Sequence, residues 1–296
     1  MAEESFLEYV PSTFVVPQEE LASRHARIRD LMAKRDLDLL LVAADMNIHK
    51  RGHVRYVSGY CTIDYYSYVL FPREGELAFF GHYRGYARWA RVLTGITKSG
   101  FTPFGEEQEV GGPHVLKLVR EYKPKRLGLV GAYTMPTCLY QTLVSGLQGV
   151  HLEDASDILT TCRLAKNRYE LSMVEKAAKV ADDAYKAYLD HVRPGKKEYE
   201  VILEVMRAVL DGGGEGGIYL FTGGGIPYSR HENMAFRTIE NGDTLYFTTE
   251  ICGPGGYWTQ IGRMVSVGKR VPEVERAVKD FLEAREVALP ELVPGS

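Results

Sequence analysis

His231 is the residue of this chain best suited to moving a proton. It stands in a polar loop, residues 227–233, with the sequence Pro-Tyr-Ser-Arg-His-Glu-Asn. An imidazole accepts and donates protons around neutral pH, as the hydrolysis of a C–N bond requires. The alternative is an ordinary surface histidine, since the chain has eight histidines. We take His231 as the candidate general acid–base.

Glu250 is the second candidate, because it interrupts a strand pattern of apolar and β-branched residues at 245–251. On a strand it shares a face with Tyr246 and Thr248. A carboxylate is costly to bury unless a partner pairs with it. Glu250 could bind a cationic substrate group or orient a water, and it could equally form an ion pair with Arg263 across a hairpin. The sequence leaves these alternatives open.

Further polar groups follow Glu250 closely in the sequence. Tyr257 and Gln260 could supply hydrogen bonds to a polar substrate, and together with Arg263 they form the candidate substrate-binding set. Asp243 is assigned to a turn instead, because it ends an Asn-Gly-Asp sequence, which is turn chemistry.

The elements that must position these residues differ between the two halves of the chain. In the first half, helical patterns alternate with short apolar strands, which favours an α/β domain with helices on the faces of its sheet. The helices are predicted at residues 17–32 and 113–122, and the strands at 37–42, 65–71, 76–80 and 126–130.

The second half begins with one long amphipathic helical pattern, residues 167–191, which ends at Arg193-Pro194-Gly195. A helix at 199–210, strand-like segments up to residue 267 and a last helix at 273–287 follow. We place the domain boundary within residues 157–163, which gives domains of residues 1–160 and 161–296.

A glycine-rich run at residues 212–217 has the composition of a phosphate-binding loop but the wrong place. Such loops lie between a strand and the N-terminus of a helix, so that backbone N–H groups face the phosphate. This run follows a predicted helix and precedes a predicted strand. It is therefore interpreted as a turn or flexible linker.

Composition limits the classes of function. The 296 residues, 45% hydrophobic and 25% charged, are typical of a soluble protein with two domains. The formal net charge of −3 and the lack of a basic run argue against nucleic acid or membrane as partners. The four cysteines form no C-x-x-C pair, which argues against a zinc or redox motif. With no signal-peptide pattern at the acidic N-terminus, we expect a cytoplasmic protein.

Several segments, in order, resemble the family of creatinase, prolidase and aminopeptidase P. The matching segments are Tyr56-Val57-Ser58-Gly59, the series Arg163, Lys166 and Glu170, the helix-ending Pro194-Gly195, His231 before Asn241-Gly242-Asp243, and Gly256-Tyr257 followed by Arg263 and Gly268. The resemblance covers nearly the whole chain. It implies an N-terminal creatinase-like α/β domain followed by a pita-bread catalytic domain, with His231 as the substrate-side histidine.

The resemblance also implies a homodimer in which the first domain of one chain leans over the site of the other. Tyr65, Tyr66 and Tyr68 are a candidate lid or contact surface. A strand whose aromatic side chains face the core is the simpler interpretation.

The departures from the family pattern concern metal binding. Metal-dependent members carry one aspartate in the strand after the Gly-Asp turn and another three residues after Gly-Tyr, and such carboxylates bridge paired cations that activate water. Here the first position falls on Thr248 or Thr249, depending on the direction of counting, and the second falls on Gln260. Neutral side chains do not offset the charge of two cations, so we expect no metal and no other cofactor.

Creatinase and ectoine hydrolase share the fold and work without those aspartates. The pattern is most similar to ectoine hydrolase and its relatives, whose Phe-Glu-Ile is matched in part by Thr249-Glu250-Ile251. Creatinase carries a glutamate directly before the arginine to hold its guanidinium-bearing substrate. Gly262 occupies that place here, so creatine is a poor candidate substrate.

Members of the family continue past the Pro-Gly that Pro294-Gly295 matches, into strands that bring another histidine and two glutamates to the site. This sequence stops at Ser296. We therefore expect a catalytic domain that is incomplete at its C-terminal end, with a fragment as the favoured explanation over a natural remnant.

The sequence thus predicts a metal-independent hydrolase of a C–N bond in a small, polar, nitrogen-containing molecule. His231 and Glu250 are its expected catalytic residues. The alternatives are an Xaa-Pro dipeptidase or aminopeptidase that uses metal, and a catalytically inactive pita-bread module that binds a peptide or protein.

Overall fold

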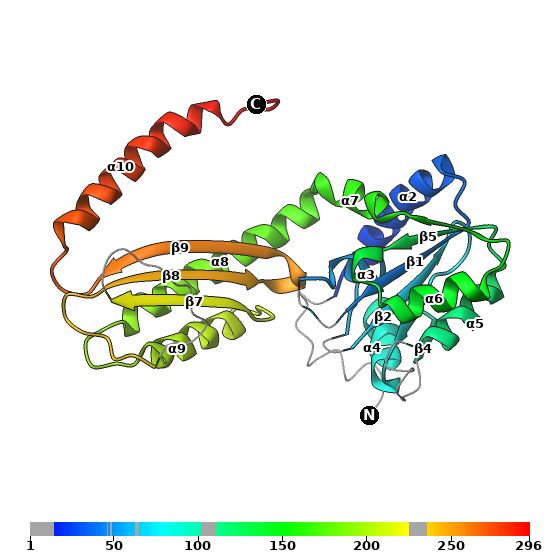
Figure 1. The fold of residues 1–296 in the computed structure, drawn as a ribbon, viewed down its shortest axis with the longest axis horizontal. Coiled ribbons are helices and arrows are strands. Elements are labelled where there is room, and N and C mark those ends of the chain that lie inside the picture. The colour runs from blue at the N-terminus through cyan, green and yellow to red at the C-terminus, as the bar shows by residue number, and fades with distance from the viewer. Residues whose placement is uncertain (1–14, 46, 48, 63–64, 102–110, 225–235) are drawn as a thin grey trace. The chain divides into compact units, whose positions relative to one another are not determined.

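The computed structural model describes residues 15–45, 47, 49–62, 65–101, 111–224 and 236–296 (Figure 1). The chain forms two compact units, one made of Met1–Met173 with Pro254–Gly256 and the other of Val174–Gly253 with Tyr257–Ser296. Among the helices of these described ranges, none is long and apolar enough to cross a membrane.

The first unit is built on a six-stranded sheet with the order β4-β3-β2-β1-β5-β6. The strands are β1 (Leu39–Ala44), β2 (Ser67–Pro72), β3 (Ala78–Gly81), β4 (Lys98–Phe101), β5 (Arg126–Val130) and β6 (His151–Asp154). The central strand β1 runs antiparallel to β2 and parallel to β5. Its sequence, Leu-Leu-Leu-Val-Ala-Ala, is buried throughout, as expected of a strand covered on both faces.

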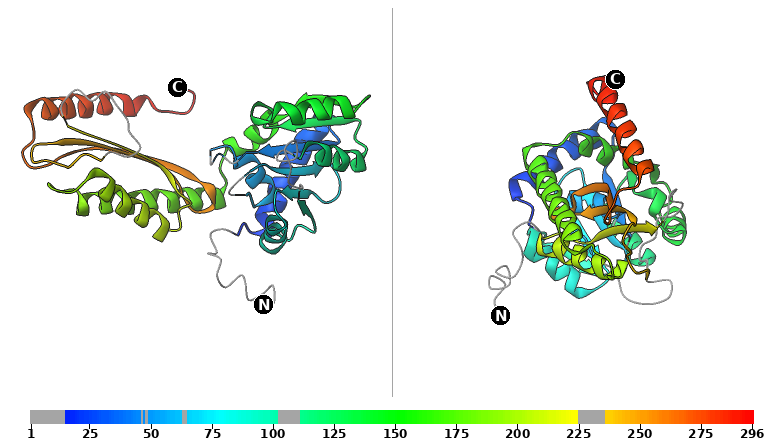
Figure 2. Two further views of the ribbon diagram at one scale, coloured as in Figure 1. Left: turned by 60° about the horizontal axis from the view of Figure 1, so that its bottom comes forward. Right: turned by 90° about the vertical axis from the view of Figure 1, so that its left-hand side faces the viewer.

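Helices cover both faces of this sheet (Figures 1 and 2). The helices are α2 (Gln18–Lys34), α3 (Gly52–Ser58), α4 (Arg84–Thr94), α5 (Gly112–Tyr122), α6 (Thr137–Gly146) and α7 (Ser156–Leu164), with a short 3-10 turn, η2 (Ala132–Thr134). One core joins the sheet to α2, α3, α4 and α7, and the other joins it to α5 and α6. The predicted α/β architecture is confirmed.

The sequence pattern located α2, α5, β1, β2, β3 and β5 to within a few residues. It did not predict α3, the helix that carries the Tyr56 to Gly59 motif. Gly59 ends α3 with a φ of 76°, a left-handed conformation that glycine adopts without a steric penalty. The motif therefore serves as a helix terminus in this unit.

The tyrosines at the start of β2 are part of the unit's own packing. Tyr68 is almost fully buried, and Tyr66 stacks against it with ring centroids 6.3 Å apart. Tyr65 stacks on His82, with centroids 4.3 Å apart. The core-facing interpretation is therefore correct for Tyr68.

The second unit has a three-stranded antiparallel sheet, ordered β7-β8-β9. Its elements are α8 (Arg168–His191), which begins in the first unit, α9 (Glu198–Asp211), β7 (Gly217–Gly224), β8 (Thr244–Cys252), β9 (Trp258–Ser266) and α10 (Pro272–Ala288), with the 3-10 turns η3 (Pro254–Gly256) and η4 (Leu289–Glu291). The glycine-rich run connects α9 to β7, as predicted for a turn, and Gly213 and Gly216 in it have positive φ.

Helices α8 and α9 cover one face of this sheet (Figures 1 and 2). The buried apolar residues of β8 on that face are Leu245, Phe247 and Ile251, and they pack with Val180 and Val205 from the two helices. Side chains alternate along a strand, so residues 246, 248 and 250 lie on the opposite face. We call this second face, which points away from α8 and α9, the outer face of the sheet.

The start of α8 is tied to α2 through buried charges. The Arg24 Nε donates to Glu20 Oε1 at 2.6 Å, and the Asn167 side-chain amide donates to the other Glu20 oxygen at 2.7 Å. Glu20 and Arg24 are only 7% and 3% exposed. Asn167 and Glu170 also cap the helix reciprocally, each side chain accepting the other's backbone N–H.

Arg163 and Lys166, the other two residues of the series that includes Glu170, also make contacts that hold the fold. The Lys166 ammonium donates to the Arg163 carbonyl at 2.6 Å at the end of α7, and Arg163 lies 3.4 Å from the His53 ring. Burial and the Arg163 guanidinium lower the pKa of His53 to about 4, so this histidine is neutral at pH 7 and accepts from the arginine. Because α7 and the first turn of α8 belong to the first unit, the units divide at residue 173, later than the boundary expected at residue 160.

Replacing Glu20 by alanine should destabilise the first unit by about 3 kcal/mol. The buried Arg24 guanidinium would lose the Glu20 carboxylate, and removing one member of a buried ion pair is strongly destabilising. Urea unfolding followed by Trp89 fluorescence, in a Trp258→Phe background, reports on this unit, since the chain has two tryptophans. The exposed neighbour Glu19→Ala is the matched control and should change stability by less than about 1 kcal/mol. Equal effects of the two variants would contradict the role of the buried pair.

Candidate active site on the outer face of the sheet

Glu250 and Gln260 lie directly opposite each other on adjacent strands. The antiparallel register of β8 and β9 pairs them residue for residue. Both side chains belong to the outer face, where Glu250 is half-buried and Gln260 is exposed. A cross-strand pair of this kind brings side chains within about 5 Å of each other at the Cβ atoms. The structure therefore brings these two predicted site residues together.

The neighbouring pair of residues on the outer face is Thr248 and Gly262. Thr248 is 4% exposed, whereas the glycine has no side chain to place above the strand. Tyr246 follows on the same face, opposite Met264. The outer face thus carries a carboxylate, an amide and two hydroxyl groups along one stretch of β8 and β9.

Thr249 lies on the other side of the sheet. Its cross-strand partners are Ile261 and Tyr219, which belong to the core under α8 and α9. Two side chains that act on one ligand must share a face, so Thr249 is not the counterpart of Gln260. Counting residues along the sequence missed this, and only the strand register identifies Glu250 as the group opposite Gln260.

Arg263 does not join this group, and the alternative of a Glu250–Arg263 ion pair is wrong. Arg263 is paired with Phe247 in the register, on the face that α8 and α9 cover. Its guanidinium lies 5.8 Å from the ring centroid of Tyr185 on α8, and it donates to the Gly262 carbonyl at 2.7 Å. Strand alternation therefore separates Arg263 from Glu250.

The other two predicted site residues are placed less directly. Tyr257 lies at the hairpin turn before β9, where its carbonyl accepts the Gly253 N–H at 2.8 Å. It is half-buried and lies outside the Glu250–Gln260 pair. His231 falls in residues 225–235, outside the described residues, so its place in the site stays a prediction.

Two other acids of the second unit are held by one arginine. The Arg237 Nε donates to Glu198 at 3.1 Å and its Nη2 donates to Asp243 at 2.6 Å. Burial disfavours the charge on Arg237, but the two carboxylates outweigh that effect and raise its pKa. Asp243 also accepts the Glu240 N–H at 2.7 Å, which confirms its assignment to the turn.

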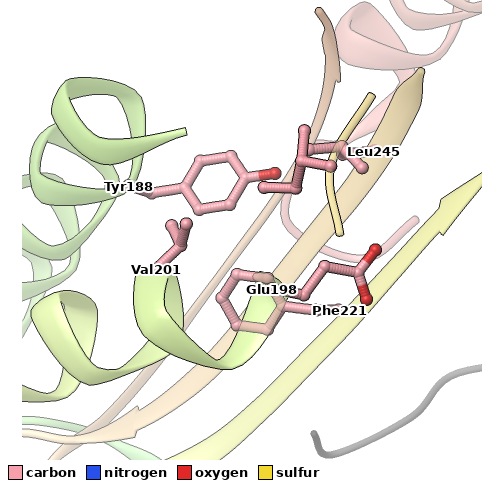
Figure 3. Close-up of a pocket in the computed structure, with 6 residues that line it drawn as sticks. Tyr188, Glu198, Val201, Phe221 and Leu245 are labelled. Carbon is pink, nitrogen blue, oxygen red and sulfur yellow. The ribbon is translucent and has the colours of Figure 1, made fainter. Parts of the chain in front are cut away.

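Glu198 borders a small cavity under the sheet (Figure 3). Its volume is about 10 Å³, and its walls are Tyr188, Glu198, Val201, Phe221, Ile239 and Leu245. A space of this size holds one water at most. The cavity therefore belongs to the core, and substrate must bind elsewhere.

Comparison with known proteins supports the resemblance seen in the sequence. The profile of the creatinase/prolidase N-terminal domain matches residues 24–165, and that of metallopeptidase family M24 matches residues 172–296. The chain belongs to the creatinase/prolidase family. It is thus a member of a family of hydrolases with the pita-bread fold.

The relatives within this family are named for different reactions. The chain is 26% identical to the ectoine hydrolase of Halomonas elongata, over 94% of this chain and 73% of that protein. It is 22% identical to the Xaa-Pro dipeptidase of Pyrococcus horikoshii, over 91% of this chain and 71% of that protein. The solved X-Pro aminopeptidase of Thermotoga maritima, 20% identical, has a TM-score of 0.73 over 90% of this chain and 71% of that one. At this identity the structural match shows the fold alone.

The metallopeptidase relationship raises the question of a metal centre, which the outer face does not fit. The donors at the central pair are one carboxylate, Glu250, and one neutral amide, Gln260, with the Thr248 hydroxyl beside them. Paired divalent cations are normally bridged by several carboxylates. Across the described ranges, His, Cys, Asp and Glu side chains form no group of three or more that could hold a metal ion.

Replacing Arg263 by glutamine should change the free energy of unfolding by no more than about 0.5 kcal/mol, because its guanidinium is exposed and forms no ion pair with Glu250. The matched variant Arg237→Gln should cost about 3 kcal/mol, since it removes the guanidinium from a buried ion pair with Glu198. Urea unfolding followed by Trp258 fluorescence, in a Trp89→Phe background, measures both. A loss of several kcal/mol for Arg263→Gln would contradict the assignment of Arg263 to the helix-covered face.

Proposed function

We propose that this protein hydrolyses a C–N bond in a small, polar, nitrogen-containing molecule without a divalent metal, at a site on the outer face centred on Glu250 and Gln260. The observation that supports this is the environment of Glu250. It is half-buried and lies opposite an amide, and no ion pair to a basic side chain engages it within the described part of the chain. A cationic nitrogen of a substrate would supply the missing partner.

Partial desolvation of Glu250 favours the binding of a cation. A carboxylate that is partly removed from water binds an opposite charge more strongly than one in bulk solvent. Arginines of the chain itself form ion pairs with three other acids, Glu20, Glu198 and Asp243. Glu250 differs from them in being available to a ligand.

The chemistry requires a water that attacks carbon and a proton for the leaving nitrogen. In this proposal His231 takes the proton from the attacking water and returns it to the nitrogen as the C–N bond breaks. Glu250 holds the cationic part of the substrate, and the Gln260 amide donates to or accepts from its polar atoms. Tyr257 stays a candidate for a further hydrogen bond, whereas Arg263 is withdrawn from the set.

The ectoine hydrolase relative supports this class of substrate. Ectoine is a small ring that carries an amidinium group and a carboxylate, so it offers the cation that Glu250 would bind. A guanidinium substrate such as creatine would call for a glutamate at position 262, and Gly262 stands there instead. We therefore take ectoine as the probe for the proposed reaction.

A second candidate, an Xaa-Pro peptidase, is favoured by the M24 profile and by the names of several relatives. That reaction in the metal-dependent members rests on bridging carboxylates. The donors present at Glu250 and Gln260 do not supply them, which is why we prefer the metal-independent reaction.

Replacing Glu250 by glutamine should weaken substrate binding while keeping the side-chain shape. With ectoine as substrate, we expect KM to rise about 10- to 100-fold, or 1.4–2.7 kcal/mol at about 1.4 kcal/mol per tenfold, with a smaller change in kcat. Steady-state kinetics measure both constants. The control is Glu240→Gln, an exposed turn residue whose variant should behave like the wild type.

The His231→Ala variant, in the same assay, should lower kcat by 10²–10⁴-fold through the loss of general acid–base catalysis. Circular dichroism must show that each variant is folded. Unchanged KM in folded Glu250→Gln would remove Glu250 from substrate binding. Full turnover by folded His231→Ala would remove His231 from the mechanism.

A further inference from the structure

The hydroxyl group of Thr248 is buried without a hydrogen-bond partner. The residue is 4% exposed, and within the described residues its Oγ1 neither donates nor accepts a hydrogen bond. A buried hydroxyl in that state is unfavourable for folding, because it has lost water and gained nothing in exchange. Such a group calls for an explanation other than stability.

The position of this hydroxyl points toward ligand binding. It lies on the outer face, two residues along the strands from Glu250 and Gln260, and opposite Gly262. A Cβ atom added to Gly262 would lie 3.3 Å from the Thr248 Oγ1 and 3.4 Å from the Tyr246 hydroxyl. Two hydroxyl groups therefore converge on the space that the glycine leaves without a side chain.

Thr249 provides a comparison within the same strand. It is fully buried, and its Oγ1 also has no partner among the described residues. Thr249, however, faces the core under α8 and α9, next to Ile261 and Tyr219. The two threonines thus share residue type, strand, burial and an unpaired hydroxyl, and they differ in the face on which they lie.

We propose that Thr248 is a substrate-binding residue whose hydroxyl donates a hydrogen bond to a carboxylate oxygen of the substrate while Glu250 holds its cationic nitrogen. This role of Thr248 rests on the proposed function. It narrows the class of substrates to small zwitterions. Residues two apart on a strand are separated by about 6.6 Å, a distance that a small ring with a charge on each side spans.

In this proposal, the substrate reaches Thr248 through a movement of the neighbouring Tyr246 side chain. Tyr246 is half-buried on the same face, with its hydroxyl near the same glycine. In this proposal, rotation of the Tyr246 side chain, a fast motion for a partly exposed residue, opens the way to the threonine. The glycine at position 262 leaves room for the substrate carboxylate, and any larger residue there would fill that room.

The test compares two variants and two ligands. Thr248→Val and Thr249→Val each replace a hydroxyl by a methyl group of the same shape. The ligands are ectoine and the same cyclic amidine without its carboxylate, and their dissociation constants are measured by calorimetry on the purified protein. Thermal unfolding without ligand is the second readout, because loss of an unpaired hydroxyl should leave the melting temperature equal or higher in both variants.

We expect Thr248→Val to weaken ectoine binding about tenfold and to leave the affinity for the carboxylate-free amidine unchanged. Thr249→Val should bind both ligands like the wild type. Ectoine binding by Thr248→Val equal to that of the wild type would overturn the role of Thr248 while the proposed function stands. Failure of the wild-type protein to bind either ligand would overturn the proposed function, and this inference with it. A large loss of stability in Thr248→Val alone would show a structural role for the hydroxyl and would also overturn the inference.

Discussion

The antiparallel register between β8 and β9 determines which side chains meet on the outer face of the sheet. That register places Glu250 opposite Gln260, and Thr248 opposite Gly262, on the face that points away from α8 and α9. A shift by one residue would turn each of these side chains toward the helices and would turn Phe247 and Ile251 toward the outer face, so that a carboxylate would be buried under α8 and α9. The apolar residues that alternate with the polar ones oppose such a shift, because they pack into the core under α8 and α9. The same packing that stabilises the second unit thus fixes the chemistry of its outer face.

The chain separates its structural charges from the one we assign to function. Glu20 is engaged by Arg24, and Glu198 and Asp243 are both engaged by Arg237. These groups hold helix ends and a turn, and their removal is expected to cost stability. Glu250 lies on β8, the central strand of its sheet. Within the described segments no arginine forms an ion pair with it. Arg263, the nearest basic residue in the hairpin, is directed to the opposite face by strand alternation.

Much of the fold could be predicted from the sequence, because the apolar periodicities of α2, α5, α8, β1 and β5 are strong. Short helices such as α3 were missed, since a few residues carry too little periodicity. The compact units divide at residue 173, and the contact between Asn167 and Glu20 that links the start of α8 to α2 joins residues distant in sequence, which no local pattern reveals. In the site, strand alternation correctly grouped Glu250 with Tyr246 and Thr248. The position opposite Gln260 and the orientation of Arg263 depend on which residues pair across the hairpin. The five residues that connect Cys252 to Trp258 do not reveal that pairing from the sequence alone.

We propose that the Glu250–Gln260 pair acts on its substrate without paired metal ions. The most direct measurement is elemental analysis of protein purified without chelator, combined with an assay of ectoine hydrolysis before and after treatment with a chelator. We predict no stoichiometric manganese, cobalt or zinc and no loss of turnover on chelation. A content of about two such ions per chain, with turnover abolished by the chelator and restored by the metal, would contradict it.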